Sequence, residues 1–301
     1  TIMKSNIILS GCGGGYDVFC TIPLFFENQD KNRILVSLSF TQESFLLELT
    51  KKKEVIQLSR NLFLINFQKI THLNNNYFPE YYLSKHLNHP VYLILNDTTI
   101  NDINHAYKII INKLKIKDLY LVDGGCDVLL SGRESDLATP VEDMMHLKAV
   151  LDLPIYNKYV CAVGMPCDCH SLPRPELHQR LQELEDVLLE KKVWSLQNEN
   201  ISMYYQIVNE SRIDKSIVNC LICSSLEGKR GYHVPEKLKY RIQKNNVEID
   251  ELMITFVKYH LKDVSDRNLY LNELNGDHKT DKIDSYIMKF HKSLMTQRLT
   301  T

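Results

Sequence analysis

Four glycines stand within five consecutive positions near the start of the chain, after an apolar run and before Tyr16 and Asp17. This pattern predicts a strand that ends in a glycine-rich loop and opens a helix, where backbone N–H groups can hold a phosphate. Each glycine loses extra conformational entropy on folding, so such crowding indicates a close approach of the backbone to a ligand. We expect the following glycines to contact a phosphate or diphosphate: Gly11, Gly13, Gly14 and Gly15.

Carboxylates and glycines gather in a second segment, after the apolar run Leu119–Val122. Asp123 and Asp127 flank two glycines at the end of a predicted strand, and loop residues placed in this way often carry function. We expect three side chains of this segment to be catalytic: Asp123, Asp127 and Glu134. Three neighbours are expected to contact the ligand: Gly124, Gly125 and Arg133.

The same segment is long before the next helix begins. Thr139 is a suitable N-cap, Pro140 suits the first turn and Glu142 would complete a capping box, so a helix is predicted to start there. About sixteen residues then separate strand from helix, against the usual two to six, and loops of this length are usually functional.

Two further loops carry residues that are suited to binding. Asn96 follows the strand pattern Val91–Leu95, and Asp168 and His170 follow the strand pattern Val160–Val163. The run Cys167–His170 offers zinc-ligand types, but it lacks a Cys-x-x-Cys pair and fits no standard zinc module. We expect Asn96, Asp168 and His170 to contact the ligand, assign no metal ligands and leave the role of Cys167–His170 open.

Short β-rich runs alternate with helical patterns over the first two thirds of the chain. Apolar residues recur at helical spacing from Ile103 to Leu114 and from Leu177 to Leu188. This alternation predicts an α/β fold: a mostly parallel sheet, Rossmann-like or macrodomain-like, with helices on both faces. Ligands of such sheets bind outside the carboxyl ends of the strands, where the loops described above lie. The predicted strands are Ser5–Ser10, Arg33–Ser39, Asn61–Asn66, Pro90–Leu95, Asp118–Val122 and Lys158–Val163.

No Pro- or Gly-rich linker and no internal repeat divides the chain, so we expect one α/β domain over residues 1–301. Its core is predicted to span about residues 5–235 and to include a helix at Ser216–Glu227. A C-terminal extension of about 236–301, with helical additions, is predicted to contain a strand at Leu252–Tyr259 and a helix around Ile283–Leu299.

The composition argues against several classes of partner. Lys plus Arg (36) nearly balance Asp plus Glu (37), so no overall basic field would attract nucleic acid or anionic lipid. No apolar stretch reaches the roughly 20 residues of a membrane span, and the first residues do not resemble a signal peptide. We expect a cytoplasmic location. The Asn-, Ile- and Lys-rich stretches, such as Asn74–Asn76, suggest an AT-rich bacterial genome and are compatible with an effector secreted into a host cell.

Three familiar motifs are missing from the sequence. A Gly-x-Gly-x-x-Gly dinucleotide fingerprint would need glycine where Tyr16 stands, and no acidic residue clearly ends the second predicted strand at Ser37–Ser39. No Gly-Lys-Ser/Thr follows the glycine loop, and no Gly-x-Ser-x-Gly elbow occurs. A standard dinucleotide oxidoreductase, a Walker-type phosphate loop and nucleophilic acyl chemistry are therefore disfavoured.

The order and spacing of the motifs resemble those of domain-of-unknown-function family 1152, from archaea and bacteria. The resemblance spans residues 5 to about 235 and departs at Cys167–His170, where the family pattern has Asp-Gly-Glu and only Asp168 matches. Since the family name supplies no chemistry, the reaction has to be argued from the site. The matching segments are Gly11–Asp17, Val122–Asp127, Gly132–Glu134, Thr139–Asp143, Val218–Ile222 and Leu226–Gly228.

A diphosphate loop that faces carboxylates, without a strong nucleophile, suits hydrolysis at an anomeric carbon, where an acid activates water. We hypothesise an ADP-ribose-recognising hydrolase that removes ADP-ribose from a protein side chain. Arginine is the most attractive acceptor, because a carboxylate would hold its guanidinium. In this interpretation Asp17 or Asn96 contacts the adenosine side, and the three catalytic carboxylates orient the water.

Two alternatives stay open. The same carboxylates would hold Mg²⁺ against phosphates in a nucleotide phosphohydrolase or kinase-like enzyme. A non-catalytic nucleotide-binding module would use the same residues without turnover. The expected partner is accordingly an ADP-ribosylated protein or a nucleotide-like small molecule.

Overall fold

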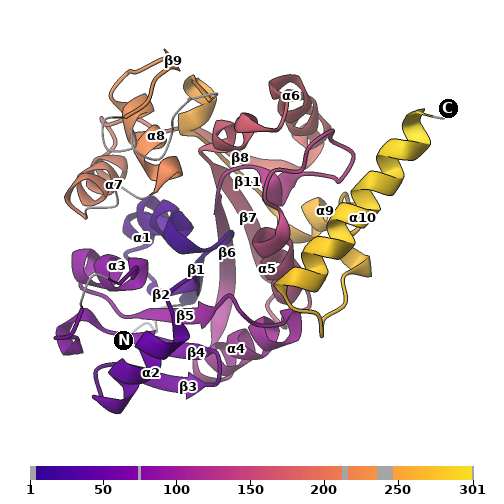
Figure 1. Ribbon diagram of the computed structural model, residues 1–301. Helices are drawn as coiled ribbons and strands as arrows, with labels where there is room; N and C mark the ends of the chain where they lie inside the picture. The colour runs from indigo at the N-terminus through magenta and orange to yellow at the C-terminus, as the bar shows by residue number, and fades with distance from the viewer. Residues whose placement is uncertain (1–4, 74–75, 212–215, 236–246, 300–301) are drawn as a thin grey trace.

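The computed structural model describes residues 5–73, 76–211, 216–235 and 247–299. Within these residues the chain forms a nine-stranded sheet in the order β3-β4-β5-β2-β1-β6-β7-β11-β8 (Figure 1). A separate pair is formed by β9 (Gly231–Tyr232) and β10 (Glu248–Ile249). The strands of the large sheet are β1 (Asn6–Gly11), β2 (Asn32–Ser39), β3 (Ile56–Ser59), β4 (Leu62–Ile65), β5 (Val91–Leu95), β6 (Ile116–Gly124), β7 (Asn157–Val163), β8 (Leu188–Val193) and β11 (Thr255–His260).

Helices fill the connections between the strands. The α-helices are α1 (Ile22–Glu27), α2 (Glu43–Lys51), α3 (Pro79–Leu87), α4 (Ile100–Lys113), α5 (Val141–Leu151), α6 (Arg174–Glu183), α7 (Glu199–Glu210), α8 (Ile217–Leu226), α9 (Leu261–Ser265) and α10 (Thr280–Leu299). Short 3₁₀ helices include η1 (Gly15–Thr21), η3 (Asp127–Leu129), η4 (Met165–His170) and η7 (Glu251–Ile254). The helix predicted at Ser216–Glu227 is confirmed as α8, with the Ser216 side chain as its N-cap.

The centre of the sheet is parallel and its edges are antiparallel. Strands β5, β2, β1, β6 and β7 run parallel to one another, which confirms the predicted mostly parallel α/β sheet. The pairs β3·β4 and β4·β5 are antiparallel at one edge, and β7·β11 and β11·β8 at the other. Only two residues join β3 to β4, and a parallel crossover would need a dozen or more.

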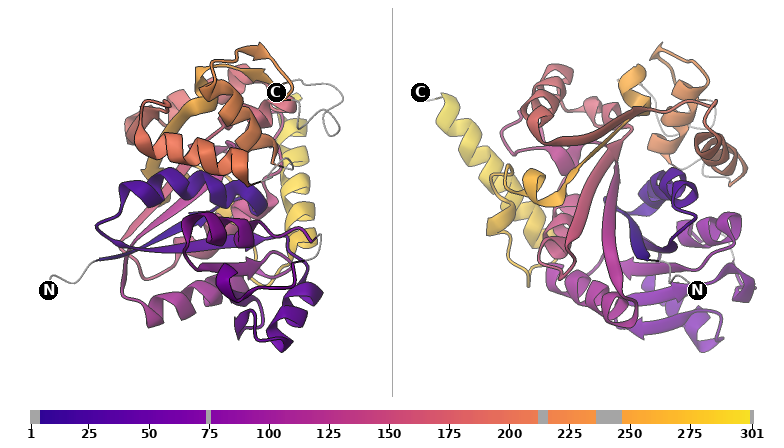
Figure 2. Two further views of the ribbon diagram at one scale, coloured as in Figure 1. Left: turned by 90° about the vertical axis from the view of Figure 1, so that its left-hand side faces the viewer. Right: turned by 180° about the vertical axis from the view of Figure 1, so that it is seen from behind.

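The predicted helices on both faces of the sheet are confirmed. In β1, Ile7 and Leu9 enter the apolar core beneath α1, α7 and α8, whereas Ile8 enters the core beneath α4, α5 and α10. Successive side chains of a strand point to opposite faces, so a strand that is covered on both sides must be apolar throughout. Figure 1 shows α1, α7 and α8 on one side of β6 and α5, α9 and α10 on the other, and Figure 2 shows the same layers from behind.

Two local predictions were wrong. The apolar stripe Leu177–Leu188 was read as one helix, but α6 ends at Glu183 and Leu188 begins β8, which pairs with β11. Thr139 does not cap α5, whose N-cap position is Pro140 and lacks a side-chain cap. The Thr139 hydroxyl instead donates to Asp127 Oδ2 at 3.2 Å, so the capping box does not form.

The segment predicted as a C-terminal extension contributes to the main sheet and to its cover. Its predicted strand is confirmed as β11, which lies between β7 and β8. Its predicted helix is α10, in which Ile283 and Ile287 are fully buried in the core shared with α5. Residues 74, 75 and 236–246, which belong to the Asn74–Asn76 stretch and to the start of the extension, lie outside the described residues. None of the helices in the described part of the chain is long and apolar enough to cross a membrane.

Candidate functional site

The candidate site lies where the parallel sheet changes the direction in which strands are added. The chain builds β1, β2 and β5 outward to one side and then returns to place β6 on the other side of β1. A crevice forms outside the carboxyl ends at such a switch point, and ligands bind there. Asp17 follows β1 in η1, and Asp123 is the penultimate residue of β6.

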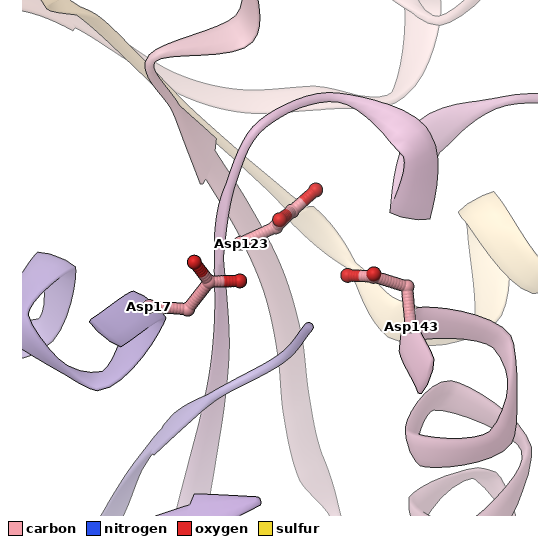
Figure 3. A group of neighbouring side chains, drawn as sticks. All are labelled: Asp17, Asp123 and Asp143. Carbon is pink, nitrogen blue, oxygen red and sulfur yellow. The ribbon is translucent and has the colours of Figure 1, made fainter. Parts of the chain in front are cut away.

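Three carboxyl groups converge at this point. One oxygen each from Asp17, Asp123 and Asp143 lies within 4.8 Å of the other two. Figure 3 shows that the three side chains come from η1, from the end of β6 and from the start of α5, and point toward one another. Asp143 was not among the predicted site residues, and the sequence analysis assigned no metal ligands.

Glycines make this convergence possible. A Cβ on Gly13 would lie 2.6 Å from Asp17 Oδ2 and 2.7 Å from Asp143 Oδ2, and a Cβ on Gly124 would lie 2.8 Å from Asp17 Oδ1. Asp17 accepts hydrogen bonds from the N–H groups of both glycines, that of Gly13 at 3.1 Å. These glycines therefore let carboxylates approach the backbone. The predicted contact of Gly13 with a phosphate and that of Gly124 with the ligand stay predictions.

Two more aspartates lie beside the three. Asp123 Oδ2 accepts from the Val128 N–H at 3.4 Å, and the carboxyl group of Asp127 lies beside that of Asp123. Asp168 accepts from the N–H groups of Cys126 and Asp127. A Cβ on Gly125 would lie 2.6 Å from Asp168 Oδ2, so this position also has no room for a side chain. We call the five residues the aspartate cluster: Asp17, Asp123, Asp127, Asp143 and Asp168.

The aspartate cluster is buried without an opposite charge. Asp123, Asp127 and Asp143 are only 2–4% exposed, whereas Asp17 and Asp168 are half-buried and form its open side. Within the described residues, none of the five forms an ion pair with lysine or arginine. Asp143 Oδ1 is buried and has no hydrogen-bond partner. Such an oxygen is costly unless a ligand or proton satisfies it.

Burial and mutual repulsion shift these groups toward their protonated forms. Burial raises the pKa of Asp123, Asp127 and Asp143 well above the ordinary range, and the charges of the neighbouring aspartates raise it further. Burial, followed by the charge of Asp168, raises the pKa of Asp17 to about 7, although the N–H groups of Gly124 and Gly13 oppose the shift. Burial also raises the pKa of Asp168.

The three converging carboxylates fit a hard divalent cation. Mg²⁺, Mn²⁺ and Ca²⁺ prefer carboxylate oxygens. Two oxygens on opposite sides of a bound ion lie about 4.2 Å apart for Mg²⁺ and about 4.8 Å apart for Ca²⁺. The three oxygens lie within 4.8 Å of one another, which is close enough for one ion to contact all three, and the unpartnered oxygen of Asp143 supplies a free ligand atom.

The local backbone structure requires glycine at the other three glycine positions of the first loop, Gly11, Gly14 and Gly15. A Cβ on Gly11 would lie 2.5 Å from the backbone nitrogen of Val18, because η1 folds back over the end of β1. Gly14 (φ 92°) and Gly15 (φ 60°) have backbone angles that favour glycine. The rings of Phe40 and Tyr77 lie against them. Their predicted contact with a diphosphate stays a prediction.

Strand β2 does not end in an acidic residue, but Glu80 of α3 lies beside its end. Glu80 of α3 is fully buried and accepts hydrogen bonds from Ser37 Oγ at 2.7 Å and Thr41 Oγ1 at 3.2 Å. Sequence reasoning missed it because Glu80 lies about forty residues beyond β2. Its hydroxyl partners join the end of β2 to α3, next to the glycine loop.

A buried polar chain holds the first loop against α5. His146 donates from Nδ1 to the Cys12 carbonyl at 2.8 Å, and its Nε2 lies 2.6 Å from the Tyr107 hydroxyl. Tyr107 in turn lies 2.6 Å from Ser10 Oγ. Burial lowers the pKa of His146 to about 4, so the ring is neutral and Nε2 accepts from Tyr107. Since His146 and Asp143 are both on α5, this chain positions Asp143 relative to the loop.

Asn219 of α8 anchors η1 from the other face of the sheet. Its amide nitrogen donates to the Tyr16 carbonyl at 3.1 Å, and its oxygen accepts from the Tyr204 hydroxyl at 2.7 Å. Asn219 is fully buried. It therefore fixes the residue that precedes Asp17 and does not face a ligand.

Glu134 and Arg133 are not brought to the aspartate cluster. Glu134 Oε1 accepts from Ser131 N and Oγ, both at 3.0 Å, and Oε2 accepts from Gly132 N at 2.9 Å. Both oxygens are thus used within their own turn. Arg133 is exposed and, with Glu134, Arg180 and others, lines a separate cavity of about 260 Å³.

Two further predicted residues lie apart from the three converging carboxylates. Asn96 follows β5, two strands away from β1, and its carbonyl accepts from Thr280 of α10 at 3.4 Å. His170 is exposed at the end of η4, with Nδ1 3.0 Å from the Cys167 carbonyl. Among the described residues, Cys167, Cys169 and His170 form no group of converging metal-ligand atoms.

Comparison with known protein families gives one match. The model of a family described as "Protein of unknown function (DUF1152)" matches residues 47–290, which is most of the sequence. The chain belongs to this family. The part that matches the DUF1152 family includes Asp123, Asp127, Asp143 and Asp168, whereas the glycine loop and Asp17 precede it. No curated protein and no solved structure was found to match the chain.

Proposed function

We propose that this protein is a divalent-cation-dependent hydrolase that acts on a nucleotide-type phosphate ester or anhydride. One observation carries the proposal: Asp17, Asp123 and Asp143 converge at the switch point of the sheet, and in the described part of the chain no lysine or arginine forms an ion pair with them. Removing one partner of a buried charge pair is strongly destabilising, so carboxylates gathered without any partner need a strong reason. A bound cation is such a reason, and it satisfies the free oxygen of Asp143 as well.

The surroundings of the aspartate cluster support a nucleotide-type substrate. Phe40 directly follows β2 and is 43% exposed, with its ring against Gly14 and Gly15. Exposed aromatic rings stack on nucleobases irrespective of base identity. Adjacent strands lie about 4.8 Å apart, so the step from β2 across β1 to β6 is about 10 Å, which a mononucleotide can span. The strand order β5-β2-β1-β6-β7 supports a Rossmann-like interpretation of the parallel core.

The residues of the chain would divide the work of hydrolysis. Asp17, Asp123 and Asp143 would hold the cation, which supplies Lewis-acid polarisation of a phosphoryl oxygen. Asp168 is half-buried at the open side of the aspartate cluster and has a raised pKa, which suits a general base. Asp168 takes a proton from the attacking water while the new P–O bond forms. The P–O bond to the leaving group then breaks, and its electron pair departs with that group.

The test measures cation binding and phosphate release together. Protein freed of metal with EDTA is titrated with Mn²⁺ by calorimetry. It is then assayed for phosphate release from ATP, ADP and AMP, and for the formation of AMP and ribose 5-phosphate from ADP-ribose. We expect activity only after Mg²⁺ or Mn²⁺ is restored. Asp143→Asn is expected to weaken Mn²⁺ binding by about tenfold or more, because a charged ligand is lost. Asp152→Asn, an exposed aspartate just beyond the same helix, is the matched control and should behave as wild type.

Two results would overturn the proposal. One is the absence of saturable binding of both Mn²⁺ and Mg²⁺ to the wild-type protein. The other is full metal affinity and full activity in Asp143→Asn. Tight nucleotide binding without any product, in the presence of either cation, would instead favour a non-catalytic nucleotide-binding module.

A second candidate is the removal of ADP-ribose from a protein arginine. Within the ranges that the structure describes, no lysine or arginine forms an ion pair with the aspartate cluster. This observation favours the second candidate, because such a site suits a guanidinium leaving group. Products separate the two candidates. Free ADP-ribose and unmodified arginine would support the second, and orthophosphate or pyrophosphate the first. The effector role suggested by composition belongs with the second candidate.

A further inference from the structure

We infer that an open cavity at the amino ends of β1, β2 and β5 binds a small organic anion. The cavity has a volume of about 360 Å³ and is lined by residues that include Lys31, Arg33 and His89. None of the described residues that line it is a carboxylate, and Ile34, Tyr92 and Leu114 provide an apolar wall. Small-molecule sites commonly have this size and combine an apolar lining with a few polar groups.

Arg33 is held by contacts with Phe25, but not all of its hydrogen-bond donors have an acceptor. Its guanidinium lies 4.0 Å from the centre of the Phe25 ring, and Nη1 donates to the Phe25 carbonyl at 2.9 Å. The Nε atom of the same group is buried and has no hydrogen-bond partner. A buried charged donor is expected to have an acceptor, so Arg33 keeps hydrogen-bonding capacity that its contacts with Phe25 do not use.

The positive charge of the cavity is uncompensated. Among the described residues, neither Arg33 nor Lys31 forms an ion pair. Lys31 Nζ donates one hydrogen bond, to Asn28 Oδ1 at 3.0 Å, and an ammonium has two further protons to donate. Arginine and lysine side by side bind phosphate or carboxylate oxygens. With the apolar wall, this chemistry selects a phosphate or carboxylate attached to an apolar body.

The cavity is separate from the aspartate cluster. Asn6 and Asn32, the first residues of β1 and β2, line the cavity, whereas the aspartates lie at or beyond the opposite, carboxyl ends of the parallel strands. The six residues of β1 span about 20 Å. The inference therefore does not depend on the proposed hydrolase, and metal-free aspartates would repel an anionic probe.

The experiment titrates metal-free protein with phenyl phosphate, benzoate and inorganic phosphate by calorimetry. We expect phenyl phosphate to bind about tenfold more tightly than inorganic phosphate, because only the former reaches the apolar wall. Arg33→Met keeps a long unbranched side chain but removes the guanidinium, and is expected to lower the affinity about tenfold or more. Lys31→Met should lower it several-fold, and the exposed Lys69→Met serves as the control that leaves it unchanged.

Each result is decisive for the cavity. Benzoate binding more tightly than phenyl phosphate supports the inference and identifies the anionic group as a carboxylate. The inference is wrong if none of the three probes binds saturably up to about 10 mM. It is also wrong if Lys31→Met and Arg33→Met both keep wild-type affinity. If Arg33→Met fails to fold, Lys31→Met, whose side chain is half-exposed, decides the matter alone.

Discussion

Two regions of the molecule bury carboxylates from the segment that follows β6: the aspartate cluster and the turn formed by Ser131–Glu134. The carboxylates of the two regions have opposite surroundings. Glu134 is 7% exposed, and each of its oxygens accepts hydrogen bonds from its own turn. Asp143 is 3% exposed, faces Asp17 and Asp123, and leaves one oxygen without a partner. A buried acid is therefore not by itself a sign of chemistry. The informative sign is a buried acid whose charge nothing in the protein balances.

The largest expected difference between the two regions is in catalysis. Asp123→Asn should reduce cation-dependent hydrolysis by about 100-fold or more, because one ligand of the cation loses its charge. Glu134→Gln should retain activity within about threefold, because its side chain serves only its own turn. Initial rates at saturating Mn²⁺ measure both. The comparison fails if Glu134→Gln loses as much activity as Asp123→Asn while remaining folded.

The second difference is in stability. Glu134→Ala should lower the free energy of unfolding by about 2–4 kcal/mol, because the N–H groups of Ser131 and Gly132 lose a charged acceptor. Asp143→Asn, measured in EDTA, should leave the free energy of unfolding unchanged or raise it, because it removes repulsion from the cluster. Urea unfolding followed by circular dichroism gives both values. A large loss of stability in Asp143→Asn would show that this carboxylate is structural.

The smallest effect is a pH dependence that belongs to the aspartate cluster alone. The pKa of Asp17 rises from 3.8 to about 7 on folding, so the folded chain binds more protons between these pH values. The contribution of Asp17 to stability is therefore complete below pH 3.8 and is lost as the pH rises through 7. In EDTA, the melting temperature of the wild type should fall by about 2–6 °C relative to Asp17→Asn between pH 5 and 8.

The comparison of the wild type with Asp17→Asn also controls for the titration of His146. His146, with a pKa lowered to about 4, loses its stabilising effect as the pH falls from 6.5 toward 4. This opposite contribution is present in both proteins and cancels when they are compared. Saturating Mg²⁺ should reverse the trend, because a cation replaces the protons of the cluster. A melting-temperature difference that does not change with pH would contradict the shift assigned to Asp17.

Much of the fold could be predicted because its signals are local. The central parallel strands are continuous apolar runs, as strands covered on both faces must be, and Ile7, Ile8 and Leu9 show this pattern. The edges were harder. Strand β8 carries Glu190, Lys191 and Lys192 among its apolar residues, and its pairing with β11, more than sixty residues later, is not visible in the local pattern.

The site could be predicted only in part, and Asp143 shows why. Asp17, Asp123, Asp127 and Asp168 were expected because they follow strand patterns. Asp143 lies in the first turn of a helix, where an acid is ordinary. One signal was available: most residues of α5 are apolar and buried, and an acid on the buried face of a helix must face something polar.

By itself the sequence determined the strand and helix alternation, the glycine-rich turns and the presence of acids at strand ends, since all of these depend on neighbouring residues. Only the tertiary structure decided which acids meet. Asp17, Asp123 and Asp143 converge because β1 pairs with β6 more than a hundred residues later, and because α5 packs beside both. Glu134 stays apart because its own turn satisfies it. Long-range pairing depends on the burial of whole faces of the sheet, which no local pattern contains.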